Sequence, residues 1–331
     1  MEPEAARLLT ARSEKQSSRS CGRRRRAADP DDARRWSPQP GVIFLRPVLA
    51  SRAVVPFERG IMVATDKLFA GSIPEIYERF MVPLIFEPYA RDLAGRVAKA
   101  NPRDVLEIAA GTGVLTRAMA SKLSARVRMV ATDLNQPMLD QAQARPVDNS
   151  HIAWQQADAL ALPFQDKSFD AVACQFGVMF FPDKVKGYKE ARRVLKDGGR
   201  YFFNVWDKIS DNEFADVVTQ ALAAMYPDDP PRFMARTPHG YNDVETIRAD
   251  LKAAGFGDVT VDAVEARSRA PSAREPALGY CQGTPLRNEI EARDQSKMEK
   301  ATAAVAEALA SRFGNGAVDG RIRALVITAT R

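Results

Sequence analysis

The sequence predicts an α/β fold with a doubly wound parallel sheet, and two observations carry this prediction. Short apolar segments typical of buried strands alternate with segments of helical spacing from residue 105 to residue 206. The first of these strands is followed at once by Gly111 and Gly113, which allow a sharp turn into the next helix. A strand, a glycine turn and a helix together form a unit that binds nucleotides in many sheets of this class. Because any tight strand-to-helix turn favours glycine, the neighbouring segments must decide what this turn does.

The elements can be justified in chain order from their spacing. Residues 73–86 have apolar side chains at helical spacing and predict one or two amphipathic helices, cut by Pro83 and Pro88. The run at 105–108 has one acid, Glu107, among apolar residues, which is the pattern of a strand buried on both faces. By the same criteria we expect further strands at 127–131, 151–155, 169–174, 200–206, 259–264 and 322–329. Further helices are expected at 90–98, 114–123, 214–226 and 244–254, with a mostly helical stretch at 272–313.

The charge of the chain is concentrated in its first segment. Residues 1–61 contain 13 basic and 7 acidic side chains, which accounts for the whole net charge of +6. This segment is rich in Arg, Ser and Pro and has no helical or alternating period, so we interpret it as a disordered basic extension. We expect residues 62–331 to form a single domain. Since that domain carries no basic excess, specific nucleic-acid binding is not expected.

Two hypotheses remain for the extension. It is a translated upstream region if the natural start is Met62, and a chain beginning there is then expected to fold unchanged. Alternatively, the arginine run at 23–26 steers an acidic partner by its charge. We expect neither a secretory signal nor a transit peptide, because the apolar run at 42–50 starts late and is interrupted, and acids lie among the arginines.

Cysteine and histidine are both sparse. The chain has three cysteines without CxxC spacing and two histidines, so we expect neither a disulfide framework nor a metal site. A reducing, cytoplasmic setting is the natural expectation. No stretch of residues 62–331 is long and apolar enough to predict a membrane span. None of these features predicts the oligomeric state.

Polar residues directly follow several of the expected strands. In doubly wound sheets ligands lie outside the carboxyl ends of the strands, so residues 109–113, Asp133, Asp158 and Gln175 are expected to meet in one cleft. Asp133 comes 20 residues after the glycine turn, the position from which an acid binds ribose hydroxyls. Its alternative role is a cap for the helix that begins near Asn135. For Asp158 the alternative is a simple loop turn.

Five motifs in this region carry a resemblance to a known family. They occupy residues 107–113 (EIAAGTG), 132–139 (TDLNQPML), 158–164 (DALALPF), 168–170 (SFD) and 193–199 (RVLKDGG). In this order and spacing they resemble the class I S-adenosylmethionine-dependent methyltransferases. Within them the resemblance is to the type 11 group, which includes the quinone-biosynthesis C-methyltransferases. The sequence departs from the family's first motif at Ala109, a position that is usually glycine.

The resemblance implies a Rossmann-like sheet of seven strands whose last strand lies antiparallel between the fifth and the sixth. It also implies a helical cap, formed by about 207–243 and 267–318, over the acceptor pocket. The implied activity is transfer of a methyl group from S-adenosylmethionine to a small-molecule acceptor by in-line displacement, with the acceptor atom (O, C or N) unresolved. Such a transfer depends chiefly on holding the acceptor and the methyl group in line.

The resemblance also assigns residues to the methionine part of the cofactor. Glu107 is implied to help hold its ammonium group, and Tyr77 to close over the same end. Gln175 and Phe176 are implied to line the methyl end. The turn that passes along the methionine part comprises Ala109, Gly111, Thr112 and Gly113.

For the nucleoside part, Asp133 is implied to bind both ribose hydroxyls. Leu134 and Met138 are implied to flank the adenine. Asp158 would accept from the amino group of the adenine, and the Ala159 N–H would meet a ring nitrogen. The resemblance therefore implies an S-adenosylmethionine cofactor and no metal.

Two other function classes remain open at this point. A nicotinamide-dependent oxidoreductase would share the strand, the glycine turn and Asp133, but the G-x-G-x-x-G pattern is absent, since Thr116 stands three residues after Gly113. A catalytically silent S-adenosylmethionine-binding partner subunit is not excluded by the sequence. Nucleic-acid methylation is poorly supported, because residues 174–177 read Cys-Gln-Phe-Gly instead of the Asn/Asp-Pro-Pro-aromatic motif of amino-methylating enzymes.

His239 is the candidate catalytic base. A base is needed only where the acceptor starts as a phenol, an alcohol or an acidic carbon. His239 lies outside the cofactor motifs, in the segment expected to cover the cleft. Its alternative is a loop histidine with a purely structural hydrogen bond.

Overall fold

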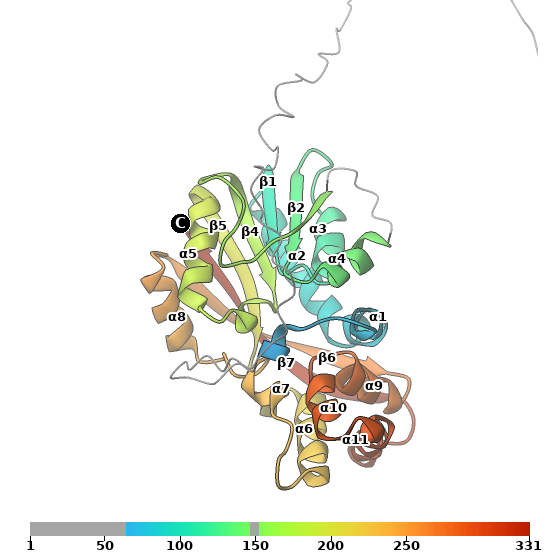
Figure 1. The fold of residues 1–331 in the computed structure, drawn as a ribbon. Coiled ribbons are helices and arrows are strands. Elements are labelled where there is room, and N and C mark those ends of the chain that lie inside the picture. Colours follow the sequence, from blue (N-terminus) through green and yellow to red (C-terminus); the bar gives the residue numbers. More distant parts are fainter. Residues whose placement is uncertain (1–63, 146–151) are drawn as a thin grey trace, which may run out of the picture. The chain divides into compact units, whose positions relative to one another are not determined.

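The computed structural model describes residues 64–145 and 152–331, so the expected extension (1–61), Met62 and His151 lie outside the described residues. The described chain forms a seven-stranded sheet in the order β3-β2-β1-β4-β5-β7-β6 (Figure 1). Its strands are β1 Asp104–Ile108, β2 Arg128–Asp133, β3 Ile152–Gln156, β4 Phe169–Gln175, β5 Leu195–Trp206, β6 Val259–Ala270 and β7 Val318–Thr330.

The strand directions follow the doubly wound pattern. β1 pairs in parallel with β2 and β4, β2 pairs in parallel with β3, and β4 does so with β5. β7 pairs antiparallel with both β5 and β6, so the last strand is inserted between the fifth and the sixth. The predicted fold class is therefore confirmed.

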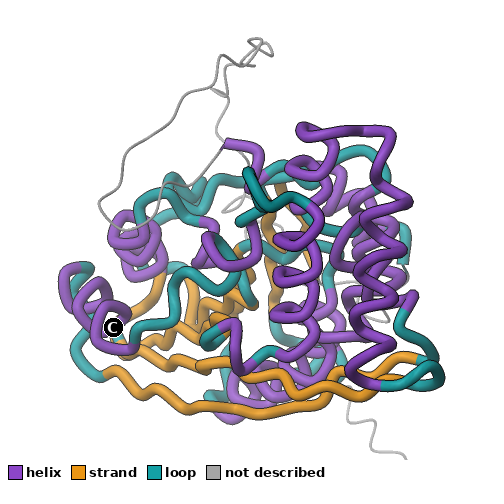
Figure 2. The backbone as a smooth tube through the Cα atoms, turned by 90° about the horizontal axis from the view of Figure 1, so that it is seen from below, coloured by secondary structure: helices purple, strands orange, loops and turns teal. Residues whose placement is uncertain are grey.

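Both faces of the sheet are covered by helices (Figure 2). Neighbouring residues of a strand point to opposite faces. Accordingly, Val105 of β1 belongs to an apolar cluster with side chains of α2 and α3, whereas Leu106 belongs to a second cluster with side chains of α5 and α8. These helices are α2 Glu87–Lys99, α3 Val114–Ala120, α5 Lys184–Val194 and α8 Val244–Ala253. Burial on both faces explains why β1 reads as a nearly continuous apolar run.

The N-terminal helical region is continuous. α1 (Ile73–Ile76), the π-helix η3 (Tyr77–Phe86) and α2 follow one another without a break. The expectation that Pro83 and Pro88 cut this region is therefore wrong. In an α-helix the ring of Pro83 would meet the carbonyl of residue i−4, and the wider i→i+5 turns of the π-helix relieve that clash. Pro88 lies in the first turn of α2, where a missing N–H is tolerated.

The remaining helices lie in the connections between the strands. In Figure 1, α6, α7, α9, α10 and α11 gather beside β6 and β7. The α-helices not yet given are α4 Gln136–Gln143, α6 Glu213–Met225, α7 Phe233–Arg236, α9 Arg274–Gln282, α10 Leu286–Asp294 and α11 Met298–Phe313. The short 3-10 turns are η2 Ala64–Lys67, η4 Val178–Phe180, η5 Ile209–Asp211 and η6 Gln295–Lys297. Within the described residues, no helix has the length and apolarity to cross a membrane.

Candidate functional site

A pocket lies where the parallel strands end. Its lining includes the residues that directly follow β1, β2, β3 and β4, together with side chains of η3 and of the helical segments after β5 and β6. Ten of the residues predicted from the sequence lie in this lining. They are Tyr77, Ala109, Gly111, Asp133, Leu134, Met138, Asp158, Ala159, Gln175 and Phe176. The other four predicted residues, Glu107, Thr112, Gly113 and His239, are not part of the described lining.

The glycine turn after β1 depends on left-handed backbone. Gly111 has φ +57°, and a Cβ there would meet only the Met138 side chain, at 3.5 Å. Gly113 has φ +82°, and its Cβ would lie 2.8 Å from the Trp154 ring. Gly111 therefore leaves the backbone open toward the pocket, whereas Gly113 is required by helix and strand packing.

The backbone conformation of Ala109 explains why the family usually has glycine at this position. Its φ of +55° lies in the region that L-residues avoid. The methyl group also needs room, since a Cβ at Gly177 would lie 2.6 Å from the Cβ of Ala109. Gly177, in the loop after β4, thus leaves room for the alanine methyl group, and the positive φ of Ala109 costs some backbone strain.

Asp133 links the ends of β1 and β2. Its Oδ2 accepts a hydrogen bond from the Gly111 N–H and its Oδ1 accepts one from the Asn135 N–H, each at 2.8 Å. Asn135, not Asp133, occupies the N-cap position of α4. Burial raises the pKa of Asp133, and the hydrogen bonds from the Asn135, Gly111 and Leu134 backbones oppose that rise. A carboxylate with two acceptor oxygens keeps lone pairs for a ligand that enters the pocket.

Asp158 both forms a local loop turn and lies at the pocket, the two alternatives that the sequence left open. Its Oδ1 accepts the N–H of Leu160 at 2.9 Å, which makes a local loop turn. Asp158 also lies in the pocket lining, next to Ala157 and Ala159. The loop turn therefore holds the carboxylate at the edge of the pocket.

Glu107 is buried behind the turn. The Thr116 hydroxyl donates to its Oε2 at 2.6 Å. Burial raises the pKa of Glu107 to about 8, and the nearby Asp133 charge adds to this, while Thr116 and Arg117 oppose it. Contact between Glu107 and a ligand ammonium group stays a prediction, because its side chain is only 1% exposed and does not line the pocket.

The end of β4 carries a strained aromatic residue. Phe176 has φ +50°, and its N–H donates to the Asn204 Oδ1 at 2.9 Å. Its ring stacks on Trp206, with the centroids 3.9 Å apart and the planes 8° apart. Next to it, the Oε1 of Gln175 is buried and has no hydrogen-bond partner among the described residues. A buried acceptor of this kind, at the wall of a pocket, is suited to a donor on a ligand.

His239 is buried beside the pocket. Its Nδ1 lies 2.8 Å from the Asp207 carbonyl oxygen, so that a neutral ring donates there. Burial lowers the pKa of His239 to about 4, so the ring is uncharged at neutral pH. The hydrogen bond of the structural alternative is present, and the catalytic role stays a prediction.

Sequence reasoning did not identify the residues that form the apolar wall of the pocket. It is supplied by Phe69, Met81, Ile85, Phe86, Trp206, Phe233 and Met234. Lys67, from the turn η2, also lies in the lining. These residues belong to none of the five motifs. The helical prediction for residues 73–86 and the expected cap after β5 pointed toward the segments of some of them without singling them out.

A family model matches the part of the chain that builds most of this pocket. The ubiE/COQ5 methyltransferase family matches residues 85–266, which is more than half of the chain. This chain belongs to the ubiE/COQ5 methyltransferase family.

Relatives in this family include two bacterial enzymes. The "Ubiquinone/menaquinone biosynthesis C-methyltransferase UbiE" of Pseudomonas aeruginosa (strain LESB58) is 30% identical over 207 residues, which is 59% of this chain and 76% of that protein. The "Demethylmenaquinone methyltransferase" of Deinococcus radiodurans is 34% identical over 140 residues, which is 41% of this chain and 58% of that protein. Among solved structures, the YcgJ protein of Bacillus subtilis aligns with a TM-score of 0.46 and 20% identity, over 72% of this chain and 98% of that protein.

As a ubiE/COQ5 family member, the protein is an S-adenosylmethionine-dependent methyltransferase that acts on a small-molecule acceptor. The predictions of family, enzyme activity and cofactor are thereby confirmed. A nicotinamide-dependent oxidoreductase and a catalytically silent subunit are not favoured.

Proposed function

We propose that the acceptor is a hydroxylated aromatic ring of the hydroquinone type and that the methyl group is attached to a ring carbon. The observation that carries this proposal is the aromatic wall of the pocket. Phe176 stacks on Trp206, and Tyr77 stacks on Phe86 with ring centroids 5.0 Å apart. Flat aromatic faces favour a flat aromatic ligand. The name of the Pseudomonas aeruginosa relative speaks of ubiquinone/menaquinone biosynthesis and C-methylation, and that of the Deinococcus radiodurans relative of demethylmenaquinone, which supports the same acceptor class.

The residues at the strand ends fit the cofactor. The unpartnered Gln175 Oε1 would accept from an ammonium group, and the open side of Gly111 lets a ligand approach the backbone. Asp133 and Asp158 offer carboxylate oxygens to hydroxyl and amino donors. The bound cofactor supplies a methyl group on a positively charged sulfur.

The protein's own contribution is to position the acceptor and to exclude water. Aromatic faces hold the ring, and the aliphatic side chains of Met81 and Ile85 close the wall around it. Holding two reacting groups in line contributes on the order of 7 kcal/mol or more in favourable cases. A ring carbon that gains a methyl group also loses a proton, and we propose that His239 takes this proton. Its Nδ1 is hydrogen-bonded to the Asp207 carbonyl oxygen, which leaves Nε2 as the basic atom of the neutral ring.

Two segments are proposed as a cap over the acceptor side. Phe233, Met234 and Pro238 of segment 207–243 lie in the pocket lining, as do Thr284 and Pro285 of segment 267–318. A cytoplasmic setting is also proposed, in line with the free thiols of the two described cysteines, Cys174 and Cys281. The proposed acceptor is a small molecule, and we do not propose nucleic acid as a substrate.

The test is a transfer assay with labelled S-adenosylmethionine. We expect a prenylated hydroquinone to receive the label on a ring carbon, as read by NMR of the product. S-adenosylmethionine should raise the melting temperature and NADH should not, because only a ligand that binds the native state stabilises it. Label on an oxygen atom, or transfer to amines and not to the hydroquinone, would contradict the proposed acceptor.

Replacing Asp133 with alanine is expected to weaken S-adenosylmethionine binding by about 1.5–3 kcal/mol, the range for hydrogen bonds to a charged group. Isothermal titration calorimetry measures the change. Asp140→Ala is the matched control, because Asp140 is an exposed acid on the adjoining helix α4. Circular dichroism must show that the Asp133 variant is folded, since its carboxylate also holds the Gly111 and Asn135 amides. Unchanged affinity in a folded Asp133→Ala protein would remove Asp133 from the cofactor site.

A further inference from the structure

Lys67 places a positive charge in the pocket lining, within electrostatic range of the Asp158 carboxylate. Among the described residues of the lining, it is the one with a cationic side chain. It lies in η2, ahead of every motif that the sequence singled out. The side chain is half-buried, and its ammonium group forms no hydrogen bond or ion pair with another described residue. None of the cofactor roles assigned above uses this charge, although the Asp158 carboxylate acts on it.

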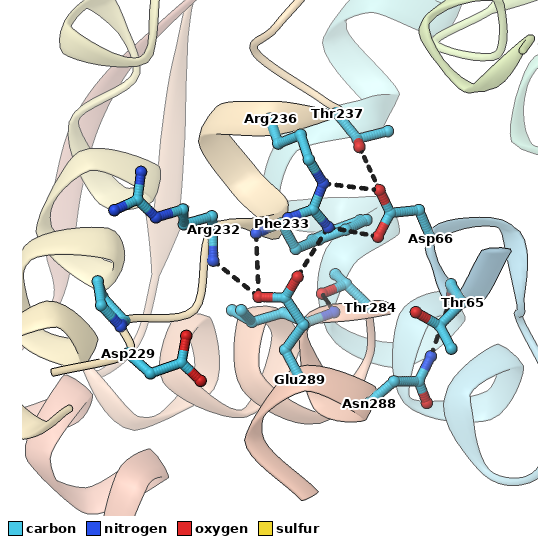
Figure 3. A network of polar contacts seen from close by, with 12 residues as sticks. Thr65, Asp66, Asp229, Arg232, Phe233, Arg236, Thr237, Thr284, Asn288 and Glu289 are labelled. Atoms are coloured by element: carbon cyan, nitrogen blue, oxygen red, sulfur yellow. Dashed lines mark hydrogen bonds and ion pairs between the residues drawn. The ribbon is translucent and has the colours of Figure 1, made fainter. Parts of the chain in front are cut away.

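The residue before Lys67 is anchored to the helices after β5 and β6. Asp66 is 1% exposed, and its carboxylate accepts from Arg236 Nη2 at 2.6 Å, Arg236 Nε at 3.1 Å and the Thr237 hydroxyl at 2.5 Å (Figure 3). Arg236 Nη2 also donates to Glu289 Oε1 of α10 at 2.7 Å. Figure 3 shows these side chains converging from η2, α7 and α10. The backbone of Lys67 is thus held on one side by a buried ion-pair network.

The residues after Lys67 are held by the other side of the pocket. The ring of Phe69 lies edge-on to Tyr77 and to Phe180, each at a centroid distance of 6.0 Å. Its N–H donates a long hydrogen bond, 3.5 Å, to Asn135 Oδ1 at the end of β2. Residues 66–69, here called the strap, therefore run across the pocket from the cap helices to the strand ends, with Lys67 between the two attachments.

The charged groups near Lys67 do not pair with its ammonium group, so that group is free to bind a ligand in the pocket. Burial lowers its pKa, and the Asp158 carboxylate opposes that fall. Lys184 of α5 is close enough to interact with it, but the Lys184 ammonium donates to the carbonyl oxygens of Met179 and Phe181, at 3.2 and 2.7 Å. Asp133 and Tyr77 are the other titratable groups in the described lining, and the lining residues of the cap bring none.

We propose that Lys67 determines acceptor specificity by binding an ionised hydroxyl oxygen of the acceptor, a phenolate or an enolate. This inference rests on the proposed function, because it requires an acceptor with an acidic hydroxyl group. An ammonium group next to that oxygen favours its ionised form. An ionised hydroxyl raises the electron density of the ring carbons and so makes them better nucleophiles. Lys67 thereby supplies a charge that a wall of aromatic side chains does not.

The first test uses a probe that needs no turnover. The phenol para-nitrophenol changes its absorbance when it ionises, so its pKa can be read while it is bound to the protein with the cofactor product S-adenosylhomocysteine. With the unmodified protein we expect the bound probe to ionise about one to two pH units lower than with Lys67→Met, and Lys67→Arg to restore most of the difference. Lys252→Met, at an exposed lysine of α8, is the control and should leave the probe unchanged. Equal pKa values of the bound probe in the unmodified and Lys67→Met proteins would overturn the proposal.

The second test distinguishes an effect of Lys67 on the acceptor from an effect on the cofactor. With a hydroquinone acceptor, Lys67→Met should lower kcat/KM about 10–150-fold, the equivalent of one hydrogen bond to a charged group, and move the rise of kcat with pH to higher pH. The Kd for S-adenosylmethionine should stay within about twofold of the unmodified value, well below that change. An equal loss of cofactor affinity would show that Lys67 binds the cofactor carboxylate and would overturn the proposal. If the unmodified protein methylates no hydroquinone, the proposed function fails, and the bound-probe measurement still decides the role of Lys67.

Discussion

Replacing Arg236 with methionine should lower the free energy of unfolding by about 3–5 kcal/mol, the range found when one partner is removed from a buried ion pair. The guanidinium contacts Asp66 and Glu289, whose side chains are 1% and 14% exposed. Methionine fills similar space but leaves the Asp66 carboxylate with the Thr237 hydroxyl as its one remaining described partner. Urea denaturation followed by circular dichroism measures the change.

A matched arginine elsewhere provides the control for this experiment. Arg267 pairs with Asp319, but both side chains are nearly half exposed. Solvent screening makes such a pair worth less than about 1 kcal/mol, so Arg267→Met should cost little. Adding Asp66→Asn to Arg236→Met should recover part of the loss, because no buried charge is then left unpaired. Equal effects of the two arginine substitutions would show that the network between the strap and the cap helices contributes no special stability.

Glu107→Gln should become progressively more stable than the unmodified protein as the pH rises from about 5 to about 8. The folded protein holds the Glu107 proton up to a pKa of about 8, whereas the unfolded chain releases it near the ordinary value of 4.5. Between these values the native state binds more protons than the unfolded state, so the stability of the unmodified protein falls as the pH rises. Burial of the carboxyl is the main cause.

The size of this effect is on the order of 3 kcal/mol over that interval, since one pKa unit corresponds to 1.36 kcal/mol. Chemical denaturation of both proteins at several pH values measures it, and their difference removes the titration of all other groups. At pH 4 the two proteins should be nearly equally stable, because both states of the unmodified protein are then protonated. A stability difference that does not change with pH would mean that Glu107 is ionised in the folded protein.

The core of the fold was predictable because local pattern and topology agree there. Val105 and Leu106 face opposite apolar clusters, and a run of apolar residues between turns is what such a strand requires. Asp133 and Gln175 were predictable site residues because each stands at the carboxyl end of a strand, and these ends lie at one edge of the sheet. The antiparallel insertion of β7 came from the family resemblance, since no local pattern encodes which strands become neighbours.

The other half of the pocket was not predictable from local pattern. Asp66 and Arg236 are 170 residues apart, and their pairing brings Lys67 to the pocket although no motif surrounds either residue. A charged residue that is buried only by long-range pairing looks, in sequence, like any solvated one. Phe233 and Thr284 reach the lining from segments 207–243 and 267–318, which the family resemblance implied as a cap without singling out either residue.

The π-helix η3 sets the positions of two aromatic rings in the pocket wall. Tyr77 and Phe86 are the first and last of its ten residues, and their rings stack in the pocket wall. In an α-helix of 3.6 residues per turn, residues at that separation would lie half a turn out of phase. The wider π turns bring the two rings into phase. An insertion or deletion of a single residue within η3 would therefore rotate one ring out of the wall while leaving both side chains in the sequence. The positions of both rings in the pocket wall thus depend on the spacing along one helix, which point substitutions leave untouched.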